Sequence, residues 1–236
     1  AGGSVDMIAR VLGQKFNASL GQPFIVDNRG GASGQIGMPM VAKAPADGYT
    51  LTVSPASFLT TNKSIFKSLP YDPVADFSPV SPLVNQPMVL VAKDRQKFST
   101  IAALVSASKA APGQVTYASS GDGSPQHLAA LMFETRTKSR LLHVPYKGGA
   151  PAIVDLIAGQ VQVVFAPISE SLQQIKLGKL RALAVTTAAR LDVFPDLPTV
   201  GDFVKGYEAS GFAGIGAPRS TPPRIIAQLN AQMNAG

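Results

Sequence analysis

The chain of 236 residues is long enough for one large domain or two of modest size, and 45% of its residues are hydrophobic. Only 15% are charged, a composition typical of a compact globular protein rather than a disordered one. The absence of cysteine excludes disulfides, thiolate catalysis and cysteine-bound metals.

The net charge of +7 comes from 21 basic and 14 acidic residues. Such a charge suits nucleic acid, an acidic membrane surface or a small anionic ligand. Nucleic-acid binding favours clustered basic residues with aromatic residues between them. Here the basic residues are scattered, tryptophan is absent and only 7% of residues are aromatic. We therefore expect an anionic ligand and no nucleic acid.

The first part of the chain alternates helical and extended patterns. Apolar residues at helical spacing predict a helix over Ser4–Leu20, with Ser4 as its N-cap and Gly21 as its end. The run "PFIVD" at 23–27 predicts a short buried strand. The expected elements that follow are a loop leading into a helix that ends near residue 43, a strand at 48–53, and a turn with a short helix at 54–62.

The later part repeats one unit, a short apolar run followed by a helical segment of about ten residues. The predicted helices are 100–109, 124–135, 150–158 and 172–177, and the predicted strands are 115–118, 141–144, 161–165 and 182–186. Strands that alternate with helices indicate βα units and mostly parallel sheets.

Two proline-rich or irregular stretches, at 69–93 and 194–218, interrupt this alternation. We interpret them as two crossings between domains, with a final helix at 221–233. The predicted domain I is discontinuous and comprises 1–92 and 206–236, while domain II comprises 93–205. Two such domains would enclose a ligand cleft and close by a hinge.

Three strand-to-helix turns consist mainly of glycine and serine: "AGGS" at the start, "ASSGDGSPQ" from residue 118, and "PYKGGA" from residue 145. The start of a helix presents unpaired N–H groups and the positive end of its dipole, and small residues let an anion approach them. Turn geometry and helix capping alone would also explain such residues. Several such turns beside one cleft favour a carboxylate or phosphate site.

The sequence resembles the Bug-type, or TctC-like, extracytoplasmic solute receptors of tripartite tricarboxylate transporters. The shared stretches occur in the order of that family and include "AGGSVDMIAR", "LGQPFIVDNRGGASGQIG", "YASSGDGSPQHLA", "HVPYKGGAPAIVDLIAGQV" and "GKLRALAVTTAAR". The resemblance implies a two-domain, periplasmic-binding-protein-like (type II) α/β fold. It also implies capture of a small carboxylate in the periplasm and its delivery to membrane permease subunits. We expect no catalytic residue, no metal site and no cofactor, and a monomer.

The resemblance also implies which residues contact the ligand, through backbone amides, small hydroxyl groups and water rather than an arginine clamp. The candidate ligand contacts are Gly3, Ser4, Ser57, Ser119, Ser120, Ser124, Gly149, Ala150, Phe165 and Ala166. Asp6 either caps the first helix or contacts the ligand, and Tyr146 either lines the pocket or packs in the core. Family members have an apolar strand before the first turn and further helical sequence after residue 233, so we expect an incomplete first domain.

The two histidines, His127 and His143, also suit other classes of protein. A pair of Ser124 and His127 is conceivable in a hydrolase, but the serine-rich turn is not a Gly-x-Ser-x-Gly elbow. A His-Glu-x-x-His metal motif is absent, and His143 is expected to be structural, in a buried strand. An enzyme on the same bilobal fold, or the effector domain of a bacterial regulator, remain the alternatives to a receptor.

Overall fold

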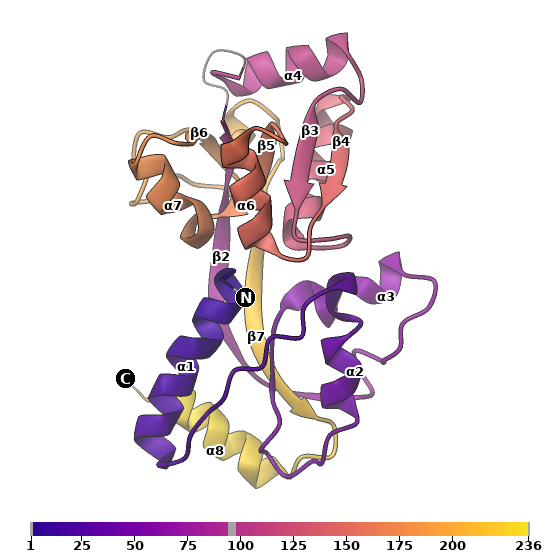
Figure 1. Ribbon diagram of the computed structural model, residues 1–236, viewed down its shortest axis with the longest axis vertical. Helices are drawn as coiled ribbons and strands as arrows, with labels where there is room; N and C mark the ends of the chain where they lie inside the picture. Colours follow the sequence, from indigo (N-terminus) through magenta and orange to yellow (C-terminus); the bar gives the residue numbers. More distant parts are fainter. Residues whose placement is uncertain (1, 94–97, 236) are drawn as a thin grey trace. The chain divides into compact units, whose positions relative to one another are not determined.

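The computed structural model describes residues 2–93 and 98–235 and has the predicted α/β class (Figure 1). Two compact units are present: unit 1 comprises Ala1–Asn85 and Phe212–Gly236, and unit 2 comprises Gln86–Gly211. Their borders fall inside the strands β2 (Phe77–Ala92) and β7 (Ser210–Pro218), whereas the sequence prediction placed the crossings at 92/93 and 205/206. No helix within the described ranges is both long and apolar enough to cross a membrane.

Unit 1 begins with helix α1 (Ser4–Leu20), whose predicted range is confirmed, but the N-cap is Gly3 and not the predicted Ser4, which is the first residue of the helix. Gly21 ends it in the left-handed conformation (φ 66°), and its N–H donates to the carbonyl of Asn17. In the first turn, Asp6 accepts hydrogen bonds from the Gly2 N–H (2.8 Å) and from Asn28 (2.8 Å) and forms an ion pair with Arg10 (3.0 Å). Asp6 therefore anchors the start of the helix to the loop that follows it.

One core cluster of unit 1 lies between α1, helix α8 (Pro223–Asn234) and three strands. Strand β1 (Thr52–Pro55) pairs antiparallel with β7, and α1 lies beside α8 (Figure 1). Phe16 of α1 packs in the same buried cluster as Val80 and Leu229. The remaining elements are η1 (Ala32–Gly34), α2 (Gly37–Ala42), η2 (Ala56–Phe58) and α3 (Asn62–Ile65).

The prediction of a buried strand at 23–27 is wrong. This segment is irregular, and Ile25 is 89% exposed. A strand needs a neighbouring strand for its backbone hydrogen bonds, and the strand pairs recorded for the described residues do not include this segment.

The second irregular stretch contains a strand that the sequence did not indicate, whereas the end of the proline-rich stretch, "MVLVAK", is strand-like in sequence and lies in a strand that begins earlier than expected. Residues 77–92 form the single strand β2, which has prolines in its first half, where a ladder hydrogen bond need not be donated. Strand β7 is rich in glycine because backbone approaches it closely. A Cβ at Gly214 would lie 3.3 Å from the carbonyl oxygen of Ser81.

Unit 2 contains a five-stranded sheet in the order β6–β2–β5–β3–β4. Strand β3 (Thr116–Ser119) runs parallel to β4 (Leu142–Pro145) and to β5 (Val163–Pro167), while β2 is antiparallel to β5 and to β6 (Arg181–Val185). The helices of this unit are α4 (Ile101–Ala110), α5 (Pro125–Thr137), α6 (Gly149–Ala158) and α7 (Ile168–Lys176), with a short turn η3 (Val200–Asp202).

Alternate residues of the central strands bury their side chains on opposite faces of this sheet. On one face, Leu90 and Phe165 pack in the same cluster as Phe133 of α5. On the other, Val91 and Val164 pack in the cluster that contains Leu156 of α6. Strands covered by helices on both faces have continuous apolar sequences, which is why "VVFA" was predicted as part of a strand and why "MVLVA" is strand-like in sequence. Burial of each such apolar side chain stabilises the folded state by about 1.5–3 kcal/mol.

Ser124 is the N-cap of α5, because its Oγ accepts the N–H of His127 at 3.3 Å. We expect Ser124→Ala to lower the free energy of unfolding by about 1 kcal/mol, measured by urea denaturation without ligand. Ser106→Ala is the matched control, since Ser106 is exposed within α4, and it should change the stability by less than about 0.5 kcal/mol. Equal effects of the two substitutions would contradict the capping role.

Hydrogen bonds from Gly2 and Asn28, with a smaller effect of Arg10, lower the pKa of Asp6 to about 2. A carboxyl group with a lowered pKa stabilises the fold above its unfolded value of about 3.9 and loses that contribution as the pH falls through the folded value. The urea midpoints of the parent and Asp6→Asn should therefore differ at pH 5 and converge toward about pH 2. A difference that stays constant over this range would show that the charge of Asp6 is not responsible.

Candidate functional site

Three strand-to-helix connections of unit 2 lie at one edge of its sheet. Strand β3 leads through the turn 120–124 into α5, β4 leads through 146–148 into α6, and β5 leads directly into α7. Because β3 is parallel to both β4 and β5, the carboxyl ends of the three strands meet at the same edge. Ligands of open α/β sheets bind beyond this edge.

The turn between β3 and α5 depends on two glycines. Gly121 (φ 124°) and Gly123 (φ 73°) have positive φ, which a residue with a side chain seldom adopts. The Ser120 N–H donates to the side chain of Gln126 on the next helix, and Ser124 caps that helix. The predicted contacts Ser120 and Ser124 are therefore held in place by α5.

The turn between β4 and α6 depends on Gly148 and Gly149. Gly148 has φ 124° and caps α6 without a side-chain hydrogen bond. Gly149 is buried, and a Cβ there would overlap the carboxylate of Glu170 on α7. Glu170 also lies 3.3 Å from the side-chain nitrogen of Gln126. A chain of polar contacts thus runs from Ser120 through Gln126 to Glu170 and joins the β3–α5 turn to α7, while Glu170 also lies against Gly149 at the start of α6.

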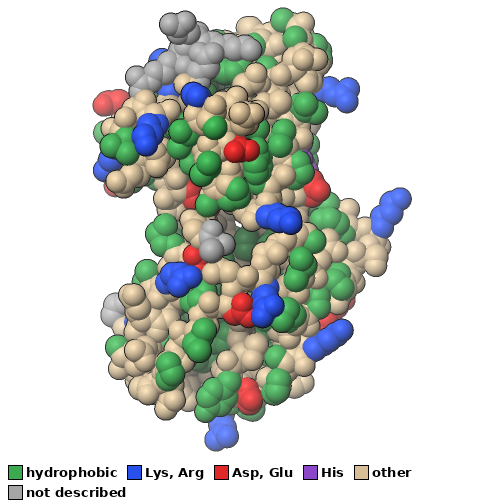
Figure 2. All heavy atoms as spheres, viewed as in Figure 1, with side chains coloured by type: hydrophobic (Ala, Val, Ile, Leu, Met, Phe, Trp, Pro, Cys, Tyr) green, Lys and Arg blue, Asp and Glu red, His purple; other side chains and the backbone are tan. Residues whose placement is uncertain are grey.

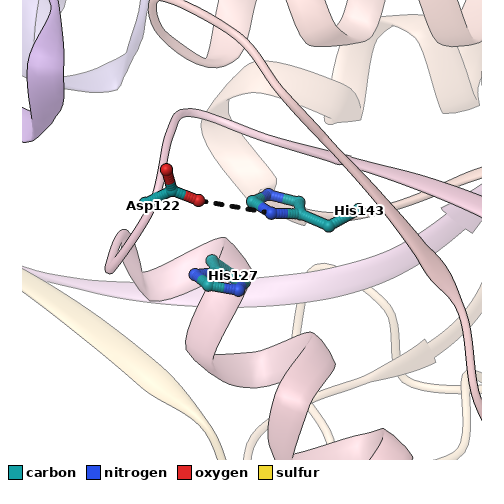
Figure 3. Close-up of side chains that lie close together, drawn as sticks. All are labelled: Asp122, His127 and His143. Carbon is teal, nitrogen blue, oxygen red and sulfur yellow. Dashed lines mark ion pairs between the residues drawn. The ribbon is translucent and has the colours of Figure 1, made fainter. Parts of the chain in front are cut away.

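Ser119, at the end of β3, is fully buried and forms a 2.6 Å hydrogen bond with Nε2 of His143 on β4. On the other side of the ring, Nδ1 lies 3.4 Å from Oδ1 of Asp122 (Figure 3). The ring of His127 stacks on His143 with 4.2 Å between centroids, and Tyr117 lies 4.8 Å from His143. Strand β4 is a partly exposed edge strand rather than the buried strand that the sequence suggested.

The order Asp122, His143, Ser119 resembles a hydrolase triad, but two properties oppose catalysis. Burial and the neighbouring His127 lower the pKa of His143 to about 4, with a smaller opposing effect of Asp122, which makes the ring a weak base. The Ser119 hydroxyl has no exposed surface and also contacts the carbonyl and the N–H of Gly121, each at 3.1 Å. The serine is therefore a structural partner of the turn.

The predicted contacts of unit 1 are Gly3, Ser4 and Ser57. Gly3 precedes α1 as its cap, and Ser4 is its first residue and is 7% exposed. Ser57 lies in η2, directly after β1, and is also buried. Its Oγ has no hydrogen-bond partner among the described residues, which is unusual for a buried hydroxyl.

The remaining predicted residues of unit 2 differ in accessibility. Phe165 and Ala166 are fully buried in the two opposite cores, so neither residue is accessible at the edge in this structure. Ala150, in the first turn of α6, is partly exposed. The hydroxyl of Tyr146 donates to Asp155 at 2.7 Å, and its ring packs against the core beneath α6.

Basic side chains are separated on the face shown in Figure 2, without a continuous basic patch. Arg29 is exposed and pairs with Asp27 at 2.8 Å. Arg181 begins β6 and pairs in register with Ala92, at the edge of the sheet opposite to the three connections. Arg181 is therefore not placed to bind an anion at the connections of unit 2.

Sequence reasoning missed Gln126, Glu170 and Asp122. Gln126 and Glu170 occupy ordinary helix positions, and only the packing of α5 against the start of α7 gives them a role. The sequence indicated a functional role for Asp122 only weakly, because an acidic residue between two glycines is common in turns.

Residues 8–236 match the family described as "Tripartite tricarboxylate transporter family receptor". Among curated relatives, Protein BugT of Bordetella pertussis is 41% identical over 237 aligned positions, which cover 99% of this chain and 72% of that protein. The length and identity of this match agree with the resemblance seen in the motifs.

Several solved structures share the fold. Rpa4515 of R. palustris, solved with adipate, is 37% identical with a TM-score of 0.96, and the match covers 100% of this chain and 79% of that one. The periplasmic binding protein BugD is 35% identical (TM-score 0.93; 99% and 78% covered). MatC from Rhodopseudomonas palustris, with bound malate, is 30% identical (TM-score 0.92; 99% and 80% covered). The periplasmic-binding-protein-like fold is confirmed, and the chain belongs to the tripartite tricarboxylate transporter receptor family.

Proposed function

We propose that this protein is a periplasmic receptor that binds a small organic carboxylate and delivers it to the membrane permease subunits of a tripartite tricarboxylate-type transporter. The observation that carries the proposal is the common edge of β4, β3 and β5, where turns of small residues lead into α6 and α5 and where β5 leads directly into α7. Family membership and the adipate and malate bound by Rpa4515 and MatC support the carboxylate class.

Backbone groups supply most of the recognition in this proposal. The first N–H groups of a helix lack an intrahelical acceptor, and the helix dipole favours a negative charge there. At the β3–α5 turn, Ser120 and Ser124 add hydroxyl groups, and the Ser124 oxygen that caps the helix can still donate its proton to a carboxylate. Donors fixed by the backbone need little ordering when the ligand binds.

Glu170 limits how a ligand uses the start of α6. Its carboxylate lies against Gly149, where it occupies the position that the helix dipole makes favourable for an anion. A ligand carboxylate that contacts Gly149 and Ala150 must displace Glu170 or approach from the side that Glu170 leaves open. Glu170 therefore favours a ligand whose second functional group can lie beside the negative charge of the Glu170 carboxylate.

The backbone contact at α6 is tested with Gly149→Ala in a Glu170→Ala background, where the overlap with the carboxylate is removed. We expect the double variant to bind its preferred carboxylate at least about tenfold more weakly than Glu170→Ala, because the methyl group blocks approach to the backbone. Calorimetric titration with a panel of mono- and dicarboxylates, including adipate and malate, measures the difference.

Arg181→Ala is the control for this experiment, since Arg181 lies at the opposite edge of the sheet. Its affinity should equal that of the parent. Abolished binding in Arg181→Ala, together with unchanged binding in the Gly149 variant, would replace the backbone contact with a side-chain ion pair. No binding of any carboxylate by the folded parent would contradict the proposed function itself.

Ser57 is tested against Ser54, because both hydroxyl oxygens are buried without a partner among the described residues, and only Ser57 is a predicted ligand contact. Removal of an unpaired buried hydroxyl should leave the stability of the unliganded protein unchanged or raise it in both Ser→Ala variants. Only Ser57→Ala should weaken carboxylate binding, by about 1–3 kcal/mol if the hydroxyl bonds the charged group. Calorimetry and thermal unfolding of both variants distinguish a ligand contact from a packing defect.

A further inference from the structure

The only two histidines of the chain, 16 residues apart in the sequence, lie together in unit 2. His127 is on the first turn of α5, His143 is on β4, and Asp122 is in the turn that precedes α5 (Figure 3). One candidate ligand atom from each residue lies within 4.8 Å of the other two. We propose that Asp122, His127 and His143 bind one divalent transition-metal ion of the Zn²⁺, Ni²⁺ or Cu²⁺ type.

The set of donors selects this class of metal. Two imidazoles and one carboxylate suit zinc, nickel and copper, whereas magnesium and calcium prefer sites made of oxygen alone. Three protein ligands leave the fourth position of a tetrahedral ion open to water or to another ligand. The metal motifs sought in the sequence would not reveal this site, because its ligands come from a turn, a helix and a strand.

The spacing of Asp122 and His143 already suits a tetrahedral ion. Nδ1 of His143 and Oδ1 of Asp122 are 3.4 Å apart. Two ligand atoms that each lie about 2.0–2.1 Å from a tetrahedral zinc ion are about 3.4 Å from one another. This pair therefore needs little movement to accept the ion between its two atoms.

Ser119 orients His143 for this role. The serine has one hydroxyl proton, and when that proton is donated to the Gly121 carbonyl (3.1 Å), Nε2 of His143 is the donor in the 2.6 Å contact. Nδ1 then has a lone pair that faces the Asp122 carboxylate, an arrangement that a cation between the two atoms stabilises. Histidines that bind metals are commonly fixed by such a hydrogen bond from the other ring nitrogen.

His127 has to turn for the site to form. Its ring is parallel to that of His143 within 5°, whereas a bound metal lies in the plane of each imidazole. Its Nδ1 accepts the Gly123 N–H at 2.9 Å, so Nε2 has the proton in the metal-free ring. The ligand atom of His127 must approach the other two by at most about 1.4 Å, a distance that a side-chain rotation supplies.

Metal binding can be assigned to this site because the chain has no cysteine and no third histidine that could form a competing site. Protein without an affinity tag is titrated calorimetrically with ZnCl₂ in a buffer that does not bind metals. We expect one ion per chain, loss of this binding in His127→Ala and in His143→Ala, and affinity at least about tenfold weaker in Asp122→Asn. Asp192→Asn, an exposed aspartate of the same unit, is the matched control and should bind as the parent does.

Thermal unfolding is measured in parallel, with and without ZnCl₂. An ion that binds only the folded state raises the midpoint of the parent and of Asp192→Asn, but not that of His127→Ala. If His143→Ala does not fold, His127→Ala and Asp122→Asn decide the question. No saturable binding by the parent, or equal binding by His127→Ala, overturns the proposal. The titration contains no carboxylate ligand, so its result does not depend on the proposed receptor function.

Discussion

The parallel pairing of β3 with β4 on one side and β5 on the other is the constraint on which the candidate site depends. Parallel strands cannot be joined by a tight hairpin, so each connection must cross over through a helix and return to the same starting edge. The start of each helix is thereby brought to the edge where the strands end. A turn of small residues after one strand would not indicate a binding site without the connections that follow the two neighbouring strands.

Most polar side chains at this edge of the sheet are uncharged or are already hydrogen-bonded to one another. His143 is held uncharged by burial, Ser119 bonds with its ring, and Gln126 joins the backbone of one turn to the carboxylate of Glu170. The unpaired N–H groups at the helix starts, together with the exposed Lys147 in the β4–α6 connection, are therefore the positive partners for an anion at this edge. This arrangement explains how a chain with a net charge of +7 can lack an arginine at the connections of unit 2.

The turn between β3 and α5 combines two kinds of chemistry in five residues. Its backbone and hydroxyl groups suit a carboxylate, and Asp122 within it faces a pair of histidines with the ligand set of a metal site. Gly121 and Gly123 permit both, because their positive φ values turn the backbone sharply and leave Asp122 exposed at the tip.

The sequence by itself determined the elements whose signals are local. Periodicity, the Gly21 stop and the apolar runs predicted α1 and the alternating elements of unit 2, because capping and side-chain burial depend on nearby residues. The shared motifs also identified the family, because the type and order of their residues are sufficient to recognise it. The tertiary structure alone decided that residues 23–27 do not form a strand, that β2 already begins at Phe77 and that 210–218 form a strand, since strands require partners distant in the sequence. It alone placed Glu170 over Gly149 and stacked His127 on His143, because contacts between separate elements follow from packing and have no local pattern.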